Sequence, residues 1–359
     1  MEHFGGFSMY KSKTELLNDF PELELTEFGD FAIKSKLIEP YEIIDFHCHL
    51  YKGAKSFVPK PVRKDHEDMN KSFFDLSCYP ITIESFDFDR VLYTSYPFEK
   101  SKLGIVKTAY ELLGMGGFYS AMTLSTPERM LRDMTINHIS KAVVLQLNTP
   151  DCDSGEEMKG ITQRYDRLIN FGSIHPNEKL AKEKIAKNLK YGVRGWKIAP
   201  HVIGENIDSV KTIELMKMLH DTNLPIVSCS GLALPEEVVA KLPNKISRVL
   251  QTQNISRFEN LLQEVPNLKL TFSHGGLYQS EELIELMNTY KDTTVDISTQ
   301  PSKNIKKFID NIGSERVLYG TDYPAFNHAF PIVSVLRATD CDEERRNVFF
   351  NNAKRLLKI

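Results

Sequence analysis

The chain has 359 residues and a mass of 41.1 kDa, a length that suits one α/β barrel with an inserted segment. Its formal net charge is −3 and its pI is about 6.4, so the sequence carries no strong positive field that would attract nucleic acid or anionic lipid. We therefore expect a small-molecule substrate, and we expect no nucleic-acid or membrane partner.

The sequence also bears on the compartment. The amino terminus lacks the apolar run of a signal peptide, and no stretch approaches the length of a membrane span. The five cysteines are an odd number, are widely scattered and form no CxxC pair, which argues against a disulfide framework. We expect a cytoplasmic protein with free thiols, and the sequence leaves open whether it forms a homo-oligomer.

From residue 41 onward, short β-branched runs alternate with segments whose apolar residues recur at helical spacing, which is typical of βα units around a parallel sheet. The predicted strands are 42–50, 141–148, 168–176, 192–200, 224–232, 268–276, 293–299 and 316–324. Helices are predicted at 178–192, 209–223, 256–267, 280–292 and 304–314, and a last one at 343–359 that packs Val348, Phe349, Leu356 and Leu357 against the barrel. Eight such strands predict an α/β fold, a (β/α)₈ TIM barrel.

The interval at about 51–138 is too long for a simple loop after a strand. We interpret it as a partly helical insertion after the first strand, which places it at the carboxyl end of the barrel, where active sites lie. Its aromatic side chains are expected to cover the ligand, namely Phe73, Phe74, Tyr79, Tyr96 and Phe98. Residues 1–40 are an N-terminal extension without a predicted role, and the barrel domain is 41–359.

The first predicted strand contains the sequence DFHCHL. Strict alternation would place Asp45, His47 and His49 on one face and Phe46 and Cys48 on the other. Two imidazoles at this spacing can bind one ion, but about 0.3 HxH patterns are expected by chance in a chain of this composition. The motif therefore needs support from other strands.

Two further strands end in potential ligands. His274 follows LKLTFS, and Asp322 follows RVLYGT. A lone His or Asp at a strand end is more often a turn or cap residue. Because the carboxyl ends of all barrel strands meet at one mouth, their joint occurrence indicates a metal site. His175 and His328 are weaker candidates at the same mouth.

As a set, these motifs resemble the amidohydrolase superfamily, in particular the amidohydrolase 2 type and the branch that contains aminocarboxymuconate-semialdehyde decarboxylase. The HPN of GSIHPN, the GxxGxK of GVRGWK and the closing NAKRLL also resemble that branch. The resemblance covers the barrel domain apart from the insertion. It implies one divalent metal, usually zinc, held by His47, His49, Asp322 and a histidine of the fifth strand, with His274 near the substrate.

The fifth strand departs from the family pattern, because PIVSCSG has Cys229 where relatives have a histidine. A thiolate is a competent zinc ligand at about 2.3 Å and favours zinc over magnesium or manganese. It would also add negative charge beside Asp322 and weaken the ion as a Lewis acid. We predict Cys229 as a ligand, and the alternative is that it is simply a small buried residue.

Lys197 ends the fourth strand, and the resemblance places it near the mouth of the barrel. Some relatives carbamylate such a lysine to bridge two metals, whereas in the mononuclear branch it is more often an unmodified partner of the substrate's charge. An ammonium here would suit a carboxylate substrate, and the alternative is a solvated lysine at a strand end. Where relatives often have a histidine before a proline, the chain has Ala199, and His201 follows that proline. The sequence does not decide whether His201 substitutes.

The leading hypothesis is a metal-dependent hydrolase of a small amide, ester or lactone that uses a metal-activated water. Asp322 would move the proton, His274 would polarise the substrate, and Lys197 would bind its charge. The first alternative is a metal-dependent decarboxylase of an unsaturated or aromatic carboxylic acid, because the motifs are most similar to a decarboxylase branch. The second is a degenerate, non-catalytic ligand-binding barrel, which Cys229 and Ala199 motivate.

Overall fold

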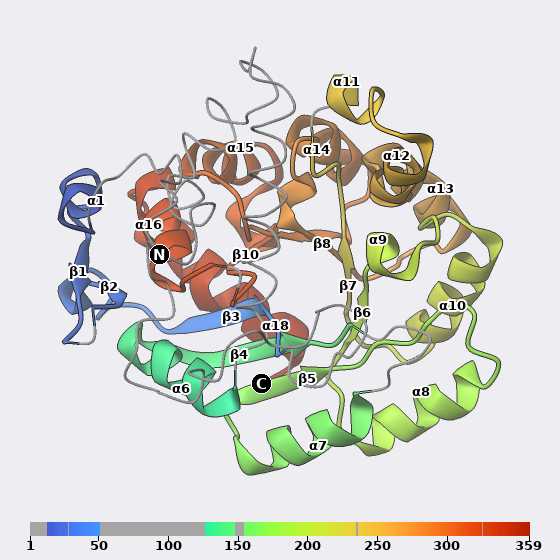
Figure 1. Ribbon diagram of the computed structural model, residues 1–359, viewed down its shortest axis with the longest axis horizontal. Helices are drawn as coiled ribbons and strands as arrows, with labels where there is room; N and C mark the ends of the chain where they lie inside the picture. The colour runs from blue at the N-terminus through green and yellow to red at the C-terminus, as the bar shows by residue number, and fades with distance from the viewer. Residues whose placement is uncertain (1–12, 28, 51–125, 148–153, 235, 325) are drawn as a thin grey trace, which may run out of the picture.

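The computed structural model describes residues 13–27, 29–50, 126–147, 154–234, 236–324 and 326–359 (Figure 1). The strands are β1 (Leu23–Leu25), β2 (Phe31–Ile33), β3 (Ile43–Cys48), β4 (Ile139–Leu145), β5 (Leu168–Phe171), β6 (Trp196–Ile198), β7 (Ile226–Cys229), β8 (Leu270–Ser273), β9 (Thr294–Asp296) and β10 (Val317–Leu318). The longer helices are α6 (Pro127–Ile136), α7 (Gly155–Arg164), α8 (Ala181–Lys190), α10 (Val210–His220), α13 (Ile255–Glu264), α14 (Ser280–Thr289), α15 (Ser302–Ile312) and α16 (Ala329–Ala338).

The shorter helices are α1 (Lys13–Asp19), α9 (Pro200–Ile203), α11 (Glu236–Val239), α12 (Asn244–Leu250), α17 (Asp342–Arg346) and α18 (Asn352–Leu357). The single turns are η1 (Ser35–Leu37), η3 (Gln251–Gln253), η4 (His274–Gly276), η5 (Ser314–Arg316) and the π-helical turn η6 (Asn347–Asn351). No helix within these described parts is long and apolar enough to cross a membrane.

Strands β3 to β10 form a parallel barrel surrounded by helices (Figure 1). One sheet has the order β10-β9-β8-β7-β6 and the other the order β3-β4-β5, with every pair parallel. Two parallel bridges close the ring, one between Gly172 and Trp196 and one between Cys48 and Tyr323. The (β/α)₈ prediction is confirmed, and each of the eight predicted strand segments overlaps one of these strands, although β4 begins two residues before its predicted segment.

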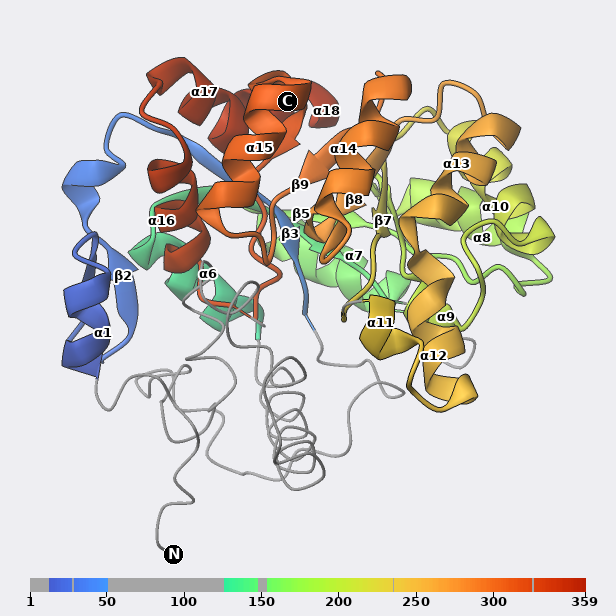
Figure 2. The same ribbon diagram turned by 90° about the horizontal axis from the view of Figure 1, so that it is seen from above.

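The two ends of the barrel differ. α17 and α18 cover one end, and β3 runs from there toward the end at which α9, α11 and α12 lie (Figure 2). Inside the first end, Ala353 and Leu357 of α18 pack with Ile44, Phe46 and neighbouring residues of the barrel interior. The carboxyl ends of the strands therefore open toward α9, which is the end where barrel enzymes place their chemistry.

The predicted closing helix packs on the barrel as expected but is not continuous. Val348, Phe349 and Leu357 are buried, while η6 interrupts the helix between α17 and α18. The carbonyl of Val348 accepts the backbone N–H of Tyr319 at 2.9 Å. This contact takes a helix carbonyl out of the regular i→i+4 pattern, which accounts for the wider π turn.

Residues 13–40, for which the sequence indicated no role, pack beside α16 in the structure. Phe20 and Phe31 contact the ring of Phe330 edge-on, at centroid distances of 5.4 and 5.5 Å. The backbone carbonyl of Phe31 also accepts a hydrogen bond from the amide of Asn327 at 3.1 Å. This part of the extension therefore completes the outer core next to the last barrel strand.

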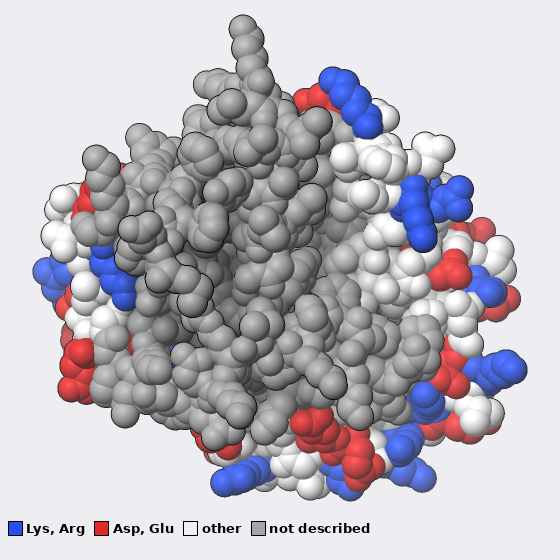
Figure 3. Space-filling model, in the orientation of Figure 1, with Lys and Arg blue, Asp and Glu red and all other residues white. Residues whose placement is uncertain are grey.

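Most of the predicted insertion, including its five aromatic residues, lies outside the described residues. Its final part carries α6, whose first turn is capped by Thr126, which accepts the N–H of Arg129. On the face shown in Figure 3, the basic and acidic side chains of the described residues are interspersed around the rim. They form no large patch of one sign there.

Candidate functional site

Three ligand-type atoms meet at the carboxyl ends of β3 and β10. The Nε2 atoms of His47 and His49 are 3.1 Å apart, and the Oδ1 of Asp322 lies 3.6 and 3.2 Å from them. The two histidines are buried, and the side chain of Asp322 is 18% exposed. In the described part of the chain, this is one of two groups of three side chains that could hold a metal ion.

The hydrogen bonds of the two imidazoles fix which nitrogen carries the proton. His47 donates through Nδ1 to Asp296 Oδ2 at 2.9 Å, and His49 donates through Nδ1 to the carbonyl of Leu145 at 2.8 Å. In the neutral rings, both Nε2 atoms are therefore lone-pair acceptors that face the oxygen of Asp322. Three acceptors with no proton between them repel one another unless a cation lies among them, so this donor set fits a divalent metal.

The pKa shifts agree with this arrangement. Burial, assisted by the charge of Lys197, lowers the pKa of His47 to about 4 despite the opposing effect of Asp296, so the ring is neutral at neutral pH. Burial raises the pKa of Asp322, but the adjacent imidazoles of His49, His274 and His47 outweigh it and hold that pKa below its ordinary range. Asp322 is therefore an ionised acceptor.

Asp296, at the end of β9, orients two histidines. The sequence did not single it out. Besides accepting from His47, it accepts the hydroxyl of Ser298, whose oxygen lies 2.9 Å from Nδ1 of His274. Because the Ser298 proton is directed to Asp296, the serine oxygen accepts from His274. An acidic residue at the end of the predicted strand 293–299 was the signal available in the sequence.

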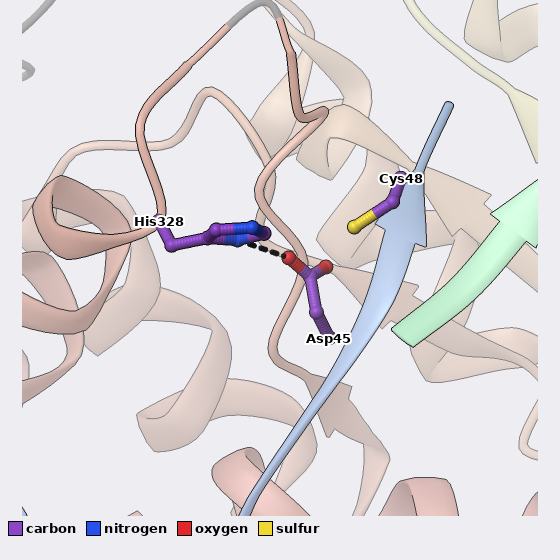
Figure 4. Close-up of side chains that lie close together, drawn as sticks. All are labelled: Asp45, Cys48 and His328. Atoms are coloured by element: carbon purple, nitrogen blue, oxygen red, sulfur yellow. Dashed lines mark hydrogen bonds and ion pairs between the residues drawn. The ribbon is translucent and has the colours of Figure 1, made fainter. Parts of the chain in front are cut away.

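The predicted alternation along β3 is wrong at one point. The pairing of β3 with β4 shifts register between Asp45 and Cys48, and these two side chains lie on the same side of the strand (Figure 4). The cause is local, because the carboxylate of Asp45 accepts the backbone N–H of His47 at 3.0 Å. Asp45 therefore does not share the face of the two ligand-type histidines.

Comparison with known proteins identifies the family. The model of the family described as amidohydrolase matches residues 44–359. This chain belongs to that family. The predicted resemblance is confirmed. Members of the family bind a divalent metal, and the group formed by His47, His49 and Asp322 could hold one. No curated protein sequence matches the chain.

Several solved structures share the fold of this amidohydrolase. An uncharacterised TIM-barrel protein from Bordetella bronchiseptica is 18% identical, with a TM-score of 0.57 and coverage of 88% of this chain and 98% of that chain. A 2,6-dihydroxybenzoate decarboxylase in complex with 2,6-dihydroxybenzoate is 14% identical, with a TM-score of 0.55 and coverage of 71% and 96%. A 5-carboxyvanillate decarboxylase from Novosphingobium aromaticivorans, in complex with manganese and 4-hydroxy-3-methoxy-5-nitrobenzoic acid, is 16% identical, with a TM-score of 0.58 and coverage of 90% and 97%. At these identities, the likeness shows a common fold.

In this amidohydrolase, Lys197 lies near His47, and Cys229 lies near Lys197 and His274. Lys197 is fully buried and donates to the hydroxyl of Ser273 at 3.0 Å, and it forms no ion pair with a carboxylate of the described residues. Burial alone would raise the pKa of the Cys229 thiol. The Lys197 ammonium and the adjacent His274 have a larger opposite effect, so the pKa lies below its ordinary value. The sulfur of Cys229 is not among the atoms grouped within 4.8 Å of one another at His47, His49 and Asp322. Its role as a ligand stays a prediction.

The remaining mouth-side histidines have different surroundings. His201 in α9 contacts Gln253 Oε1 through Nδ1 at 2.7 Å, while the amide nitrogen of Gln253 donates to the carbonyl of Gly231 at 3.0 Å. This second bond orients the amide, so Nδ1 of His201 is the donor and Nε2 an acceptor without a partner among the described residues. His175 accepts the N–H of Asn177 at 3.1 Å and so stabilises a turn.

Proposed function

We propose that this amidohydrolase is a metal-dependent decarboxylase of a small aromatic or unsaturated carboxylic acid. The observation that carries the proposal is the buried ammonium of Lys197, which has no carboxylate partner among the described residues and acts electrostatically on His47. A buried charge is costly unless it is paired, and a substrate carboxylate would supply the pair. Two similar solved structures support the reaction class, because their names describe decarboxylation of aromatic acids.

One divalent metal, which we propose to be zinc, would be held by His47, His49 and Asp322. When bound, it would polarise a substrate oxygen and stabilise negative charge on the substrate. Three protein ligands leave coordination positions open for substrate, as catalytic sites require. Cys229 is retained as the predicted fourth protein ligand, and its test is given below; with it in place, substrate would have to bind as a fifth ligand.

The other side chains would orient the acid and move the proton. Decarboxylation breaks the bond between the ring and the carboxylate, the electron pair stays on the ring carbon, and a proton takes the place of CO₂. Lys197 would hold the carboxylate, and Asp322, which is ionised at rest, would first accept a proton from a substrate hydroxyl or a water molecule and then give it to the ring carbon. His274, whose ring lies 4.7 Å from that of His47, would stabilise negative charge on the substrate. The unpartnered Nε2 of His201 would accept a hydrogen bond from a substrate hydroxyl.

The experiment is a direct comparison of two reactions on the full chain loaded with zinc or manganese. Release of CO₂ from 2,6-dihydroxybenzoate and 5-carboxyvanillate is measured beside base uptake during incubation with a panel of aryl esters, amides and lactones. We expect CO₂ release that stops on addition of chelator and is absent in His49→Ala. Hydrolysis of the panel without CO₂ release would restore the hydrolase hypothesis. Stable ligand binding without either reaction in the metal-loaded protein would favour the non-catalytic barrel.

A further inference from the structure

A second cluster of buried side chains lies on the opposite side of β3 from the proposed metal ligands. Asp45, Cys48 and His328 bring a carboxylate oxygen, a sulfur and a ring nitrogen within 4.8 Å of one another (Figure 4). Residue types alone would permit a second metal site here. The hydrogen bonds of Asp45 indicate a different role.

Both oxygens of Asp45 already accept hydrogen bonds from the protein. Oδ1 accepts the backbone N–H of His47 at 3.0 Å and that of Thr321 at 3.1 Å. Oδ2 accepts the hydroxyl of Thr321 at 2.6 Å and Nδ1–H of His328 at 3.0 Å. A carboxylate offers about four lone-pair positions, and these four donors occupy them. Little acceptor capacity is left for a cation.

Three of the four donors come from the two segments that carry the proposed ligands. His47 belongs to β3, and Thr321 directly precedes Asp322. The same segments also meet through backbone bonds, because Asp322 donates to the carbonyl of His47 at 2.8 Å and His49 donates to that of Tyr323 at 2.7 Å. A single carboxylate therefore connects the strand of the two imidazoles to the turn that presents the third ligand.

The backbone of Asp322 needs such support. Its φ angle is +60°, in the left-handed region that residues other than glycine seldom adopt. The preceding Gly320 also has to lie close to β3, since a Cβ on it would be 2.9 Å from the Cβ of His47. A turn held in this conformation relaxes when its contacts are removed, and the carboxylate of Asp322 would then move relative to the imidazoles.

His328 completes the arrangement from the start of α16. Its ring is stacked on that of Tyr323 at a centroid distance of 4.5 Å and an interplanar angle of 1°, and its carbonyl accepts the hydroxyl of Tyr319 at 2.7 Å. Its Nε2 is buried without a hydrogen-bond partner among the described residues. The neutral ring that donates through Nδ1 is the form that leaves no buried N–H unsatisfied.

We infer that Asp45 and His328 are positioning residues that hold the turn at Thr321 and Asp322 in register with His47 and His49, and thereby set the spacing of the metal ligands. The inference rests on the proposed metal ligation by these three residues. It does not depend on the reaction that the metal supports. Hydrogen-bond partners that orient metal ligands typically contribute about 10- to 100-fold to metal affinity.

The test measures Co²⁺ affinity by competition with a chelator, together with the visible absorption spectrum of bound Co²⁺, in the full chain. Asp45→Asn keeps the size of the side chain but replaces one acceptor by a donor, and His328→Phe keeps the stacking but removes Nδ1–H. The matched control is Asp208→Asn, which alters a carboxylate that binds Arg257 and Asn260. Urea unfolding of the metal-free proteins gives the unfolding free energy of each variant, so that a loss of stability can be distinguished from a loss of metal affinity.

We expect Asp45→Asn and His328→Phe to weaken Co²⁺ binding at least about tenfold and to change its spectrum, while Asp208→Asn leaves both unchanged. His328→Asn, which can place an amide N–H near the Nδ1 position, should recover part of the affinity. Unchanged Co²⁺ affinity and spectrum in folded Asp45→Asn and His328→Phe would reduce the cluster to packing and overturn the inference. A second equivalent of Co²⁺ that is lost in Cys48→Ala would also overturn it, because the cluster would then be a metal site. Failure of the proposed decarboxylation would leave these metal-binding results intact.

Discussion

Replacement of Lys197 by methionine should stabilise the protein and impair its function. The ammonium is fully buried, donates a hydrogen bond to the hydroxyl of Ser273 at 3.0 Å and also contacts the thiol of Cys229. Replacing a buried ion pair by apolar residues of similar volume is often neutral or stabilising by about 1–4 kcal/mol, and we expect a gain in this range for a buried ammonium without a carboxylate partner. Loss of the hydrogen bond to Ser273 opposes this by about 1 kcal/mol. We therefore expect the free energy of unfolding of the metal-free Lys197→Met variant to rise, by up to about 3 kcal/mol.

The same Lys197→Met replacement should weaken substrate binding. If Lys197 binds the substrate carboxylate, its loss leaves that carboxylate unpaired in a buried site, which costs about 3 kcal/mol or more. KM for an aromatic acid should then increase by at least about 100-fold, since 1.4 kcal/mol corresponds to a factor of 10. Urea unfolding and steady-state kinetics measure the two arms, with Lys306→Met on an exposed helix face as the control. A variant that is less stable than the wild type and has an unchanged KM would refute the reasoning.

His49→Ala should lose the bound metal, of which elemental analysis should find about one equivalent in the wild type; two equivalents would instead indicate carbamylated Lys197 and a dinuclear site. Cys229→Ala should lower metal content severely if the sulfur is a ligand, and should leave it unchanged, at a stability cost of about 1 kcal/mol, if the thiol is only packed. The pKa of His47 is about 4 in the fold against 6.5 ordinarily, so between these values the unfolded chain binds the additional proton. Protonation of His47 in the unfolded chain should therefore lower the unfolding free energy of the metal-free protein by about 3 kcal/mol as the pH drops from 6.5 to 4. In His47→Gln, urea titrations should show a smaller decrease of the unfolding free energy over this pH range. An equal decrease in the variant and the wild type would contradict the assignment.

The fold could be predicted because its signals are local in sequence. Each barrel strand is a short apolar run between helical patterns, and eight such runs suffice to predict closure. The meeting of His47, His49 and Asp322 could also be predicted, since carboxyl ends of parallel strands share one mouth. These inferences require only periodicity and topology.

The features that escaped prediction depend on contacts between distant residues. Asp296 orients His47 across 249 positions of sequence, and no local pattern marks that pairing. The register shift in β3 arises from one carboxylate that binds its own strand's backbone, which strict alternation cannot represent. The π turn in the closing helix likewise depends on a bond from Tyr319 to Val348. Patterns of residue type therefore predicted the scaffold and the ligand-type atoms, whereas the groups that orient them required coordinates.

The central claim is that a cation belongs among the three lone-pair atoms of His47, His49 and Asp322. The most direct measurement is a crystal structure of protein that was purified and crystallised without chelator, with anomalous data collected on both sides of the zinc absorption edge. We expect one anomalous peak about 2.0–2.2 Å from the two Nε2 atoms and from Oδ1 of Asp322. No peak there in protein supplied with excess zinc, or a peak only at Asp45, Cys48 and His328, would contradict it.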